Sequence, residues 1–480
     1  MKLIFDQSVP GRRGVRLPMR DVPAPPELDA KLLRAAPAEL PEVSELDAVR
    51  HFTNLSRLNF GVDTHFYPLG SCTMKYNPKA NELIAEMDGF ADLHPFLPQL
   101  RGGGALTQGA LAVLHDCERL LCAITGMARF TMQPLAGAHG ELTGIMIMAA
   151  HHRENGVRKT KVLVPDSAHG TNPASAAIAG YSVVSVPSTK RGLVDLDALK
   201  SMLDDETAGM MMTNPNTLGV FEEEVEDICR AVHDAGGLMY YDGANLNAIV
   251  GKCRPADMGF DIVHLNLHKT FGTPHGGGGP GAGPVGVVES LERFLPVSLP
   301  VKRDDGTYAL EYDRPDSIGY IAPFYGNFGV ILRAYAYILT LGRDGLVETA
   351  ENAVLNANYL MKRLENDYPV ATDGPCMHEF VATPPEQGDA HISAFDIAKA
   401  LIDRGMHPPT IYFPLTVREA MMIEPTETES RETLDAFAGH MAEIARLIRD
   451  DPDKLRESPV TTSVSRLDTT AAERAMDFGV

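Results

Sequence analysis

Residues 264–287 read HLNLHKTFGTPHGGGGPGAGPVGV, a short apolar run followed by one lysine and a dense glycine loop. The lysine, Lys269, stands where a strand is expected to end. Partial desolvation at such a place favours the uncharged amine, which can form a Schiff base with a carbonyl group. Lys269 is therefore the candidate nucleophile, although a lysine beside a loop is more often a solvated surface residue.

Short apolar runs alternate with helical patterns on the N-terminal side of this stretch. Such an alternation predicts a parallel or mixed sheet with helices on both faces. We therefore expect a doubly wound α/β domain, in which ligands bind beyond the carboxyl ends of the strands. The runs are ARFTMQP, KVLVPD, YSVVSVP, GMMMTNP, LMYYDG, DIVHLN and VGVV.

Asp242 ends the run LMYYDG and precedes Lys269 in the chain. A carboxylate at the end of a buried strand costs free energy unless it meets a cation or a donor, and a protonated pyridine nitrogen is such a partner. An aspartate that caps the following turn is an equally common explanation. The order Asp242 then Lys269 favours a cofactor site more than either residue does alone.

A third strand end carries small residues, in the segment QPLAGAHGELTG. Small residues such as Ala138 let backbone N–H groups approach a phosphate, and the helix N-terminus that follows, near His139, adds a favourable dipole. A tight turn that binds no ligand is the alternative.

Two further strand ends carry polar side chains. His169 follows the run KVLVPD and could lie flat on a heterocyclic ring, with a surface histidine as the alternative. Asn214 and Thr217 follow the run GMMMTNP and offer short donors and acceptors. The five strand ends thus supply, in order, a phosphate cradle, a ring platform, a polar turn, a carboxylate and a lysine, which matches the large domain of the aspartate-aminotransferase-like fold, pyridoxal-phosphate fold type I.

The organisation of the chain fits this fold class. Residues 1–100 are rich in proline and are expected to form an N-terminal arm or partial domain, and residues 101–328 the large domain. Residues 329–480 are expected to form an interdomain helix and a smaller C-terminal α+β domain. Helical spacing predicts helices over 106–124 and 394–404, the second ending at Gly405.

Composition excludes several other classes of protein. A formal net charge of −21 over 480 residues disfavours nucleic acid as a partner. No apolar run approaches the length needed to cross a membrane, and the start of the chain does not resemble a secretory signal. The six dispersed cysteines form no CxxC pair, which indicates a reducing compartment and favours the cytoplasm.

Two other motifs are set aside. The glycines of GAGPVG, residues 281–286, match a dinucleotide fingerprint, but they precede an apolar run instead of opening a helix. His264 and His268 stand four residues apart on an expected strand end without an HExxH motif, so no metal site is predicted there or elsewhere.

The same motifs, together with DTHFYPLGSCTMKYNPK and IYFPLTVREAMMIEPTETES, resemble those of the glycine-cleavage P-protein family, glycine dehydrogenase (decarboxylating), nearly end to end. The start and the length are similar to the second subunit of the two-subunit bacterial form. In segment 61–79, residues such as Cys72 and Lys75 are expected either to line the substrate entrance or to form a buried structural loop.

The resemblance implies a cofactor and roles for particular residues. The cofactor would be pyridoxal 5′-phosphate, carried by Lys269 as a Schiff base, with Asp242 holding the pyridine nitrogen protonated and His169 stacked on the ring. Glycine would lose carbon dioxide, and its aminomethyl group would pass to the lipoyl arm of the H-protein. Ala138 and His139 are assigned to the phosphate, with the ring as a second possibility for His139.

Further assignments follow from the same resemblance. Thr217 and Asn214 are candidates for contact with the ring hydroxyl group. The expected partners are P-protein subunit 1 and the lipoylated H-protein, in a heterodimer or a dimer of heterodimers. Two alternatives remain: another fold type I enzyme, such as an amino-acid decarboxylase or desulfurase, and a non-catalytic scaffold subunit.

Overall fold

The computed structural model describes residues 2–24, 26–36, 38–99, 103–386 and 391–475. The chain divides into two compact units, one made of residues 1–64 and 461–480 and the other of residues 65–460. In the first unit, α1 (Glu45–Ser56) begins after Ser44, whose hydroxyl accepts a hydrogen bond from the N–H of Asp47. The other elements of this unit are η1 (Phe5–Gln7), η2 (Ala30–Leu32) and α14 (Thr469–Ala475).

The second unit contains a seven-stranded sheet with the strand order β1-β7-β6-β5-β4-β2-β3. The strands from β6 to β3 run parallel, and β7 is antiparallel to both of its neighbours. Each of the seven apolar runs of the sequence forms one strand, so the mixed sheet is confirmed. The strands are β1 (Arg129–Thr131), β2 (Lys161–Pro165), β3 (Ser182–Val186), β4 (Thr207–Thr213), β5 (Leu238–Gly243), β6 (Ile262–Leu265) and β7 (Val285–Val287).

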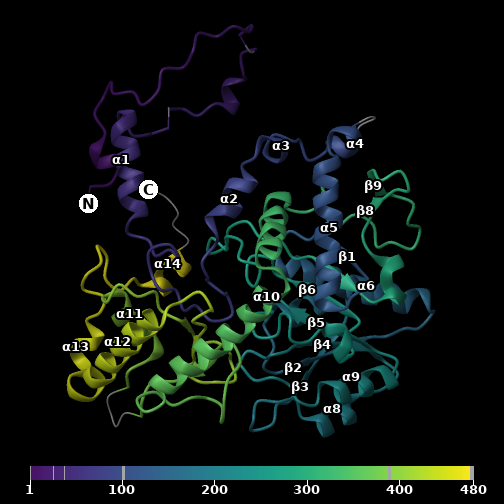
Figure 1. Cartoon of the computed structure of the whole chain (residues 1–480). Coiled ribbons are helices and arrows are strands. Elements are labelled where there is room, and N and C mark those ends of the chain that lie inside the picture. Colours follow the sequence, from purple (N-terminus) through teal and green to yellow (C-terminus); the bar gives the residue numbers. More distant parts are fainter. Residues whose placement is uncertain (1, 25, 37, 100–102, 387–390, 476–480) are drawn as a thin grey trace. The chain divides into compact units, whose positions relative to one another are not determined.

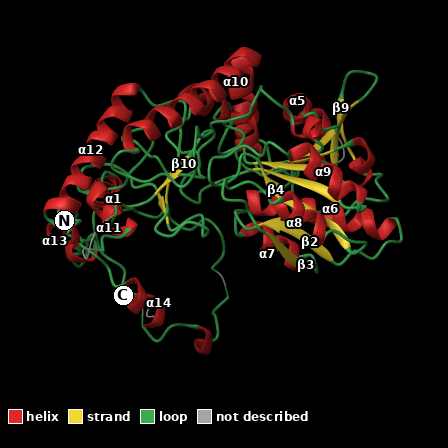
Figure 2. Cartoon of the chain, turned by 90° about the horizontal axis from the view of Figure 1, so that it is seen from below, coloured by secondary structure: helices red, strands yellow, loops and turns green. Residues whose placement is uncertain are grey.

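Helices cover both faces of this sheet (Figure 2). Side chains alternate between the faces: Met210 and Met212 of β4 join one buried cluster, and Met211 joins another. The first cluster includes α5 (Gln108–Thr125), α8 (Leu196–Met202) and α9 (Val225–Asp234). The second includes α6 (Gly137–Glu154) and α7 (Thr171–Ile178).

A smaller α+β region follows the sheet in the chain. Its antiparallel strands have the order β10-β12-β11, and they pack with several helices into a separate buried cluster. The long helix α10 extends from beside α5 to α12 in Figure 1. The elements are α10 (Phe328–Leu364), β10 (Phe380–Ala382), α11 (Ala394–Ile402), β11 (Thr410–Ile411), β12 (Met421–Ile423), α12 (Arg431–Asp450) and α13 (Pro452–Arg456).

Details of three helices differ from the sequence prediction. α5 begins at Gln108 because Thr107 departs from helical angles, and α11 ends at Ile402 with Gly405 beyond it at a φ of 69°. α10 is interrupted at Gly342, whose φ of 62° is not helical. The domain limits expected at residues 100 and 328 remain predictions.

The remaining elements of the second unit are short. They are α2 (Lys79–Ala85), α3 (Asp88–Ala91), η3 (Leu97–Gln99), α4 (Gly103–Leu106), η4 (Pro255–Met258), η5 (Glu289–Phe294), β8 (Leu299–Lys302) and β9 (Tyr308–Glu311). Two of them, β8 and β9, pair as an antiparallel hairpin. Across the described ranges as a whole, no helix is both long enough and apolar enough to cross a membrane.

Glycines allow α6 to lie close against the sheet. A Cβ at Gly144 would stand 2.2 Å from Cε2 of the buried Tyr240, and one at Gly140 would stand 2.7 Å from the carbonyl oxygen of Gly283. These contacts set the height of α6 above β5 and β7. They therefore also set where the N-terminus of α6 lies relative to the strand ends.

The substitution Gly144→Ala is expected to destabilise the protein by about 1–3 kcal/mol, because the new methyl group overlaps a ring in a packed core. The matched control is Gly439→Ala in α12, where a Cβ would have no neighbour within 4 Å. That change is expected to stabilise by about 0.5–1 kcal/mol because alanine loses less backbone entropy in a helix. Urea unfolding of both variants measures the two signs, and equal effects would contradict the packing argument.

Candidate active site

A cavity of about 340 Å³ lies at the carboxyl ends of β2, β4, β5 and β6. Its wall also includes the loop before α2 and residues beside the small sheet. The large sheet and the smaller α+β region therefore both contribute side chains to the same cavity. The lining residues are Gly70, Ser71, Cys72, Gly137, Ala138, Glu141, His169, Thr171, Thr213, Pro215, Asn216, Thr217, Asp242, Ala244, Asn245, Asn266, His268, Lys269, His275, His378, Glu379, Thr410 and Phe413.

Lys269 lies in the turn that follows β6. Its backbone N–H donates to the carbonyl of Asn266 at 3.0 Å, and its carbonyl accepts from the N–H of Gly272 at 3.1 Å, so the backbone of the turn is held at both ends. The side chain is half-buried, and its amine has no hydrogen bond or ion pair with any residue that the structure describes. The turn thus presents an amine to the cavity without a competing partner.

Asp242 lies near the end of β5 with only 3% of its surface exposed. Its Oδ1 accepts a hydrogen bond from the N–H of Ala244 at 3.1 Å and lies 3.5 Å from Nε2 of His264. Burial acts to raise the pKa of Asp242, but His264, the Ala244 N–H and Lys269 outweigh it and hold the pKa below its usual value. Asp242 is therefore a carboxylate at neutral pH.

The N-terminus of α6 opens into the cavity at Gly137 and Ala138. The first N–H groups of a helix have no partner within the helix, and they attract anions. A Cβ at Gly137 would stand 2.6 Å from Oδ1 of Asn266, so only glycine leaves this space open. Oδ1 of Asn266 is itself buried without a hydrogen-bond partner among the described residues.

His169 lies between β2 and α7 and lines the same cavity. Its Nδ1 is 2.7 Å from Oγ1 of Thr171, which donates to Oε1 of Glu141 at 2.8 Å. The ring of Phe413 lies edge-on to the imidazole, with 5.5 Å between the centroids. Thr171 at the start of α7 and the ring of Phe413 thus together hold the orientation of the His169 ring.

The other three residues singled out in the sequence differ in position. Thr217 lines the cavity, but its hydroxyl donates to the carbonyl of Ser167 at 2.5 Å. Asn214 is fully buried, and its Oδ1 accepts from the N–H of Glu222 at 2.9 Å. His139 is half-buried, and its Nδ1 accepts from the N–H of Leu135 at 3.2 Å. Neither Asn214 nor His139 is among the cavity-lining residues, so both lie beside the site.

Several cavity residues escaped the sequence prediction. Glu141 lies one turn into α6, where burial and then the charge of Asp242 raise the pKa of its carboxyl to about 8. His378 and Glu379 come from the segment before β10, in which the sequence analysis singled out no residue. An acidic residue at the end of an apolar run is a signal for Glu379, but its partners come from distant parts of the chain.

Segment 61–79 contributes residues to the cavity wall and residues to the buried packing beside it. Gly70, Ser71 and Cys72 line the cavity. Lys75, in contrast, is almost wholly buried, and its amine donates to the carbonyl of Thr270 and to Oε1 of Glu427, both at 2.6 Å. This lysine anchors the segment beneath the turn that carries Lys269.

These features fit pyridoxal 5′-phosphate. The amine of Lys269 is free for a carbonyl group, Asp242 is ionised for a pyridine nitrogen, and the helix N-terminus at Gly137 leaves room for a phosphate. The unpartnered Oδ1 of Asn266 is a further polar atom for a ligand to meet.

Comparisons with known proteins give one consistent result. Residues 24–307 match the family model "Glycine cleavage system P-protein", and residues 349–466 match "Glycine dehydrogenase, C-terminal domain". A "Probable glycine dehydrogenase (decarboxylating) subunit 2" from Caldanaerobacter subterraneus subsp. tengcongensis is 56% identical over 476 residues, which is 98% of this chain and 97% of that one. A protein of the same name from Listeria monocytogenes serotype 4a is 55% identical over 478 residues, with coverages of 99% and 97%.

Solved structures agree on the fold. A crystal structure of glycine decarboxylase (P-protein) of the glycine cleavage system, in inhibitor-bound form, matches with a TM-score of 0.71 at 22% identity, covering 87% of this chain and 93% of that one. An aspartate aminotransferase from Thermus thermophilus matches with a TM-score of 0.58 at 16% identity, with coverages of 80% and 99%. The expected fold class, pyridoxal-phosphate fold type I, is confirmed.

The substitution Lys75→Met is expected to destabilise the protein by about 3–5 kcal/mol, because it leaves Glu427 as a buried charge without its partner. The double variant Lys75→Met, Glu427→Gln is expected to recover part of this loss. Lys362→Met is the control, since Lys362 pairs with Glu365 at the surface, and its effect is expected to stay within about 0.5 kcal/mol. Denaturant unfolding tests this, and similar losses at both lysines would contradict it.

Proposed function

The chain belongs to the glycine cleavage system P-protein family, and we propose that it is the cofactor-binding subunit of a glycine dehydrogenase (decarboxylating). It releases carbon dioxide from glycine and transfers the remaining aminomethyl group to the lipoyl arm of an H-protein. The observation that carries this proposal is the free amine of Lys269, which shares one cavity with the ionised Asp242.

Pyridoxal 5′-phosphate, when bound, supplies a ring that accepts the electron pair released as carbon dioxide leaves. Lys269 holds this cofactor through its amine. Asp242 is the group that keeps a proton at the ring nitrogen, since its pKa lies below the usual range and its Oδ2 makes no hydrogen bond with a described residue. A neutral Asp242 would not hold that proton, so the groups that lower the pKa of Asp242 are part of the chemistry.

Other residues orient the cofactor. We assign the N–H groups at Gly137 and Ala138 to the phosphate, since the N-terminus of α6 faces the cavity. His169 is assigned to a face of the ring, with Ala244 among the residues that line the other parts of the cavity. His139, Asn214 and Thr217 act as supports of these elements, because their hydrogen bonds hold the loops after β1, β4 and β2.

The partners belong to the same proposal. The relatives are named subunit 2, which implies a subunit 1. We propose a heterodimer or a dimer of heterodimers, with glycine as substrate and the lipoylated H-protein as acceptor. A cytoplasmic location is also proposed, and it is supported by the six cysteines, all of which are free thiols.

The main test uses the chain with subunit 1 and pyridoxal 5′-phosphate. The wild type is expected to develop a visible Schiff-base absorption band, and borohydride reduction followed by peptide mapping is expected to place the adduct on Lys269. Lys269→Ala should lack both the band and glycine-dependent release of carbon dioxide with H-protein. Lys362→Ala, which removes an exposed lysine, serves as the control and should keep both.

Two outcomes would redirect the proposal. A wild-type complex without band or adduct would favour a non-catalytic scaffold subunit. Turnover of an amino acid without any lipoyl protein would favour another fold type I activity, such as a decarboxylase or a desulfurase.

A further inference from the structure

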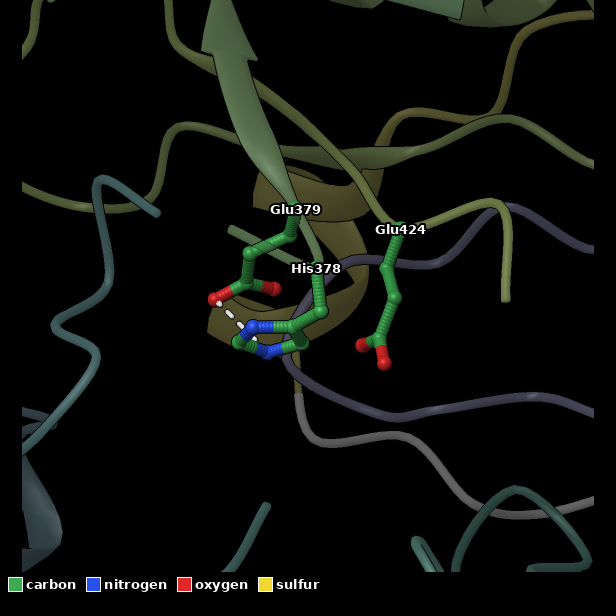
Figure 3. Close-up of side chains that lie close together, drawn as sticks. All are labelled: His378, Glu379 and Glu424. Atoms are coloured by element: carbon green, nitrogen blue, oxygen red, sulfur yellow. Dashed lines mark ion pairs between the residues drawn. The ribbon is translucent and has the colours of Figure 1, made fainter. Parts of the chain in front are cut away.

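His378, Glu379 and Glu424 form a buried cluster beside the cavity (Figure 3). Glu379 directly precedes β10 and Glu424 directly follows β12, and the antiparallel register pairs Phe380 with Ile423. The register therefore places the two glutamates opposite each other, and one ligand atom from each of the three side chains lies within 4.8 Å of the others. Glu379 reaches the cavity that contains Lys269.

Hydrogen-bond donors are divided unequally between the two carboxyl groups. Glu424 accepts from the N–H and the hydroxyl of Thr73, at 3.0 and 2.7 Å, and from Nδ2 of Asn245 at 2.9 Å. From the residues that the structure describes, Glu379 accepts a single hydrogen bond, from the N–H of Ser71 to Oε2 at 2.7 Å. Its Oε1 has no donor among the described residues and is 3.8 Å from Nε2 of His378.

This asymmetry decides where a proton resides. Two carboxyl groups that are buried together cannot both ionise without a large cost in free energy. Hydrogen bonds to a carboxylate favour its charged form. Burial and then the charge of Glu424 raise the pKa of Glu379 well above its usual value. Burial also raises the pKa of Glu424, but the hydrogen bonds from Thr73 and Asn245 oppose that rise. Glu379 therefore carries the proton, on the oxygen that lacks a donor.

The other groups that face Glu379 are not suited to carry this proton at neutral pH. Burial lowers the pKa of His378 to about 3, so its imidazole is neutral. Burial raises the pKa of the Cys72 thiol, which makes it a weak acid. Lys269 is engaged in holding the cofactor, and Glu424 is the stabilised carboxylate of the pair.

The hydrogen bonds to the two glutamates also make the cluster a poor metal site. Both oxygens of Glu424 and Oε2 of Glu379 already accept hydrogen bonds. A cation would compete for these oxygens with the donors, two of which are backbone N–H groups that hold the loop at Ser71 and Thr73, and with the proton on Glu379.

The transfer step of the proposed reaction requires an acid. The electron pair left by carbon dioxide forms a bond between the aminomethyl carbon and one sulfur of the lipoyl disulfide, the S–S bond breaks, and the electron pair of that bond stays on the second sulfur. The disulfide is thereby reduced, and the second sulfur needs one proton to leave as a thiol. Solvent then restores the proton to its donor.

We propose that Glu379 is a catalytic acid that gives its proton to the departing lipoyl sulfur, with Glu424 as the positioning residue that keeps the proton on Glu379. This inference rests on the proposed function, because it concerns the acceptor half of that reaction. It is supported by the place of Glu379 on the cavity wall, by its free Oε1 and by the donors gathered on Glu424.

The test compares Glu379→Gln with the wild type, each in complex with subunit 1 and loaded with pyridoxal 5′-phosphate. The amide oxygen of glutamine can still accept the Ser71 N–H, so the structural role is kept while the proton is lost. The cofactor absorption band and its change on adding glycine are expected to remain. Thiol formation on lipoylated H-protein in a single turnover should fall by about 100-fold or more. Glu223→Gln, at an exposed glutamate, should have no effect.

The pH profile separates an acid from a structural residue. In the wild type, thiol formation should slow as the pH rises through the pKa of Glu379. Glu379→Gln should lose this dependence, and Glu379→Asp should restore part of the rate. Glu424→Gln removes the neighbouring negative charge, lowers the pKa of Glu379 and should move the fall in rate to lower pH. A wild-type profile in Glu379→Gln would overturn the proposal.

Infrared spectra test the proton independently of activity. Glu141 is expected to contribute a protonated carboxyl stretch of its own at neutral pH, because its pKa is raised to about 8. The difference spectrum between the wild-type complex and Glu379→Gln is expected to show a further protonated carboxyl stretch, and a difference spectrum without it would overturn the proposal. The proposal would also be overturned if the wild-type complex bound one metal ion per chain and the Glu379→Gln complex did not. A wild type that carries the stretch but forms no thiol with H-protein would instead count against the proposed function.

Discussion

Glu424 is a fully buried carboxylate, and the need to supply it with donors ties together three distant parts of the chain. Its partners Thr73 and Asn245 come from the loop before α2 and from the turn after β5. A buried charge without such partners would cost several kcal/mol in the free energy of folding. The small sheet is therefore joined to the large sheet where the cavity opens, and Lys75 reinforces the joint by pairing with Glu427.

The large domain could be predicted because its signal is local. Each apolar run became a strand, and the carboxyl ends of parallel strands meet at one edge, so the order of strand-end residues placed Lys269, Asp242 and His169 around one cavity. The side-chain positions that local sequence could not give depend on tertiary contacts. Asn214 has the same local sequence signal as Thr217, yet its side chain turns inward to the N–H of Glu222 instead of lining the cavity.

The pair Glu379 and Glu424 could not be predicted in this way. The residues stand 45 positions apart in the chain, and they meet only because β10 and β12 pair antiparallel in a register that aligns Phe380 with Ile423. A register shifted by one residue would turn the side chains to the other face of the sheet. The sequence offers two glutamates at the ends of apolar runs, and only the folded structure makes them neighbours.

The site uses one kind of side chain in two protonation states. Asp242 and Glu379 are equally buried carboxyl groups, each 3% exposed, and burial acts to raise the pKa of both. Asp242 stays ionised because His264 and the Ala244 N–H lie against it, whereas Glu379 stays protonated because its nearest charged partner is another carboxylate. Such a separation of the pKa values of two carboxyl groups distinguishes the acid from the base in enzymes that work at neutral pH. One carboxyl group can therefore hold a cationic ring while the other keeps a proton for a leaving group in the same cavity.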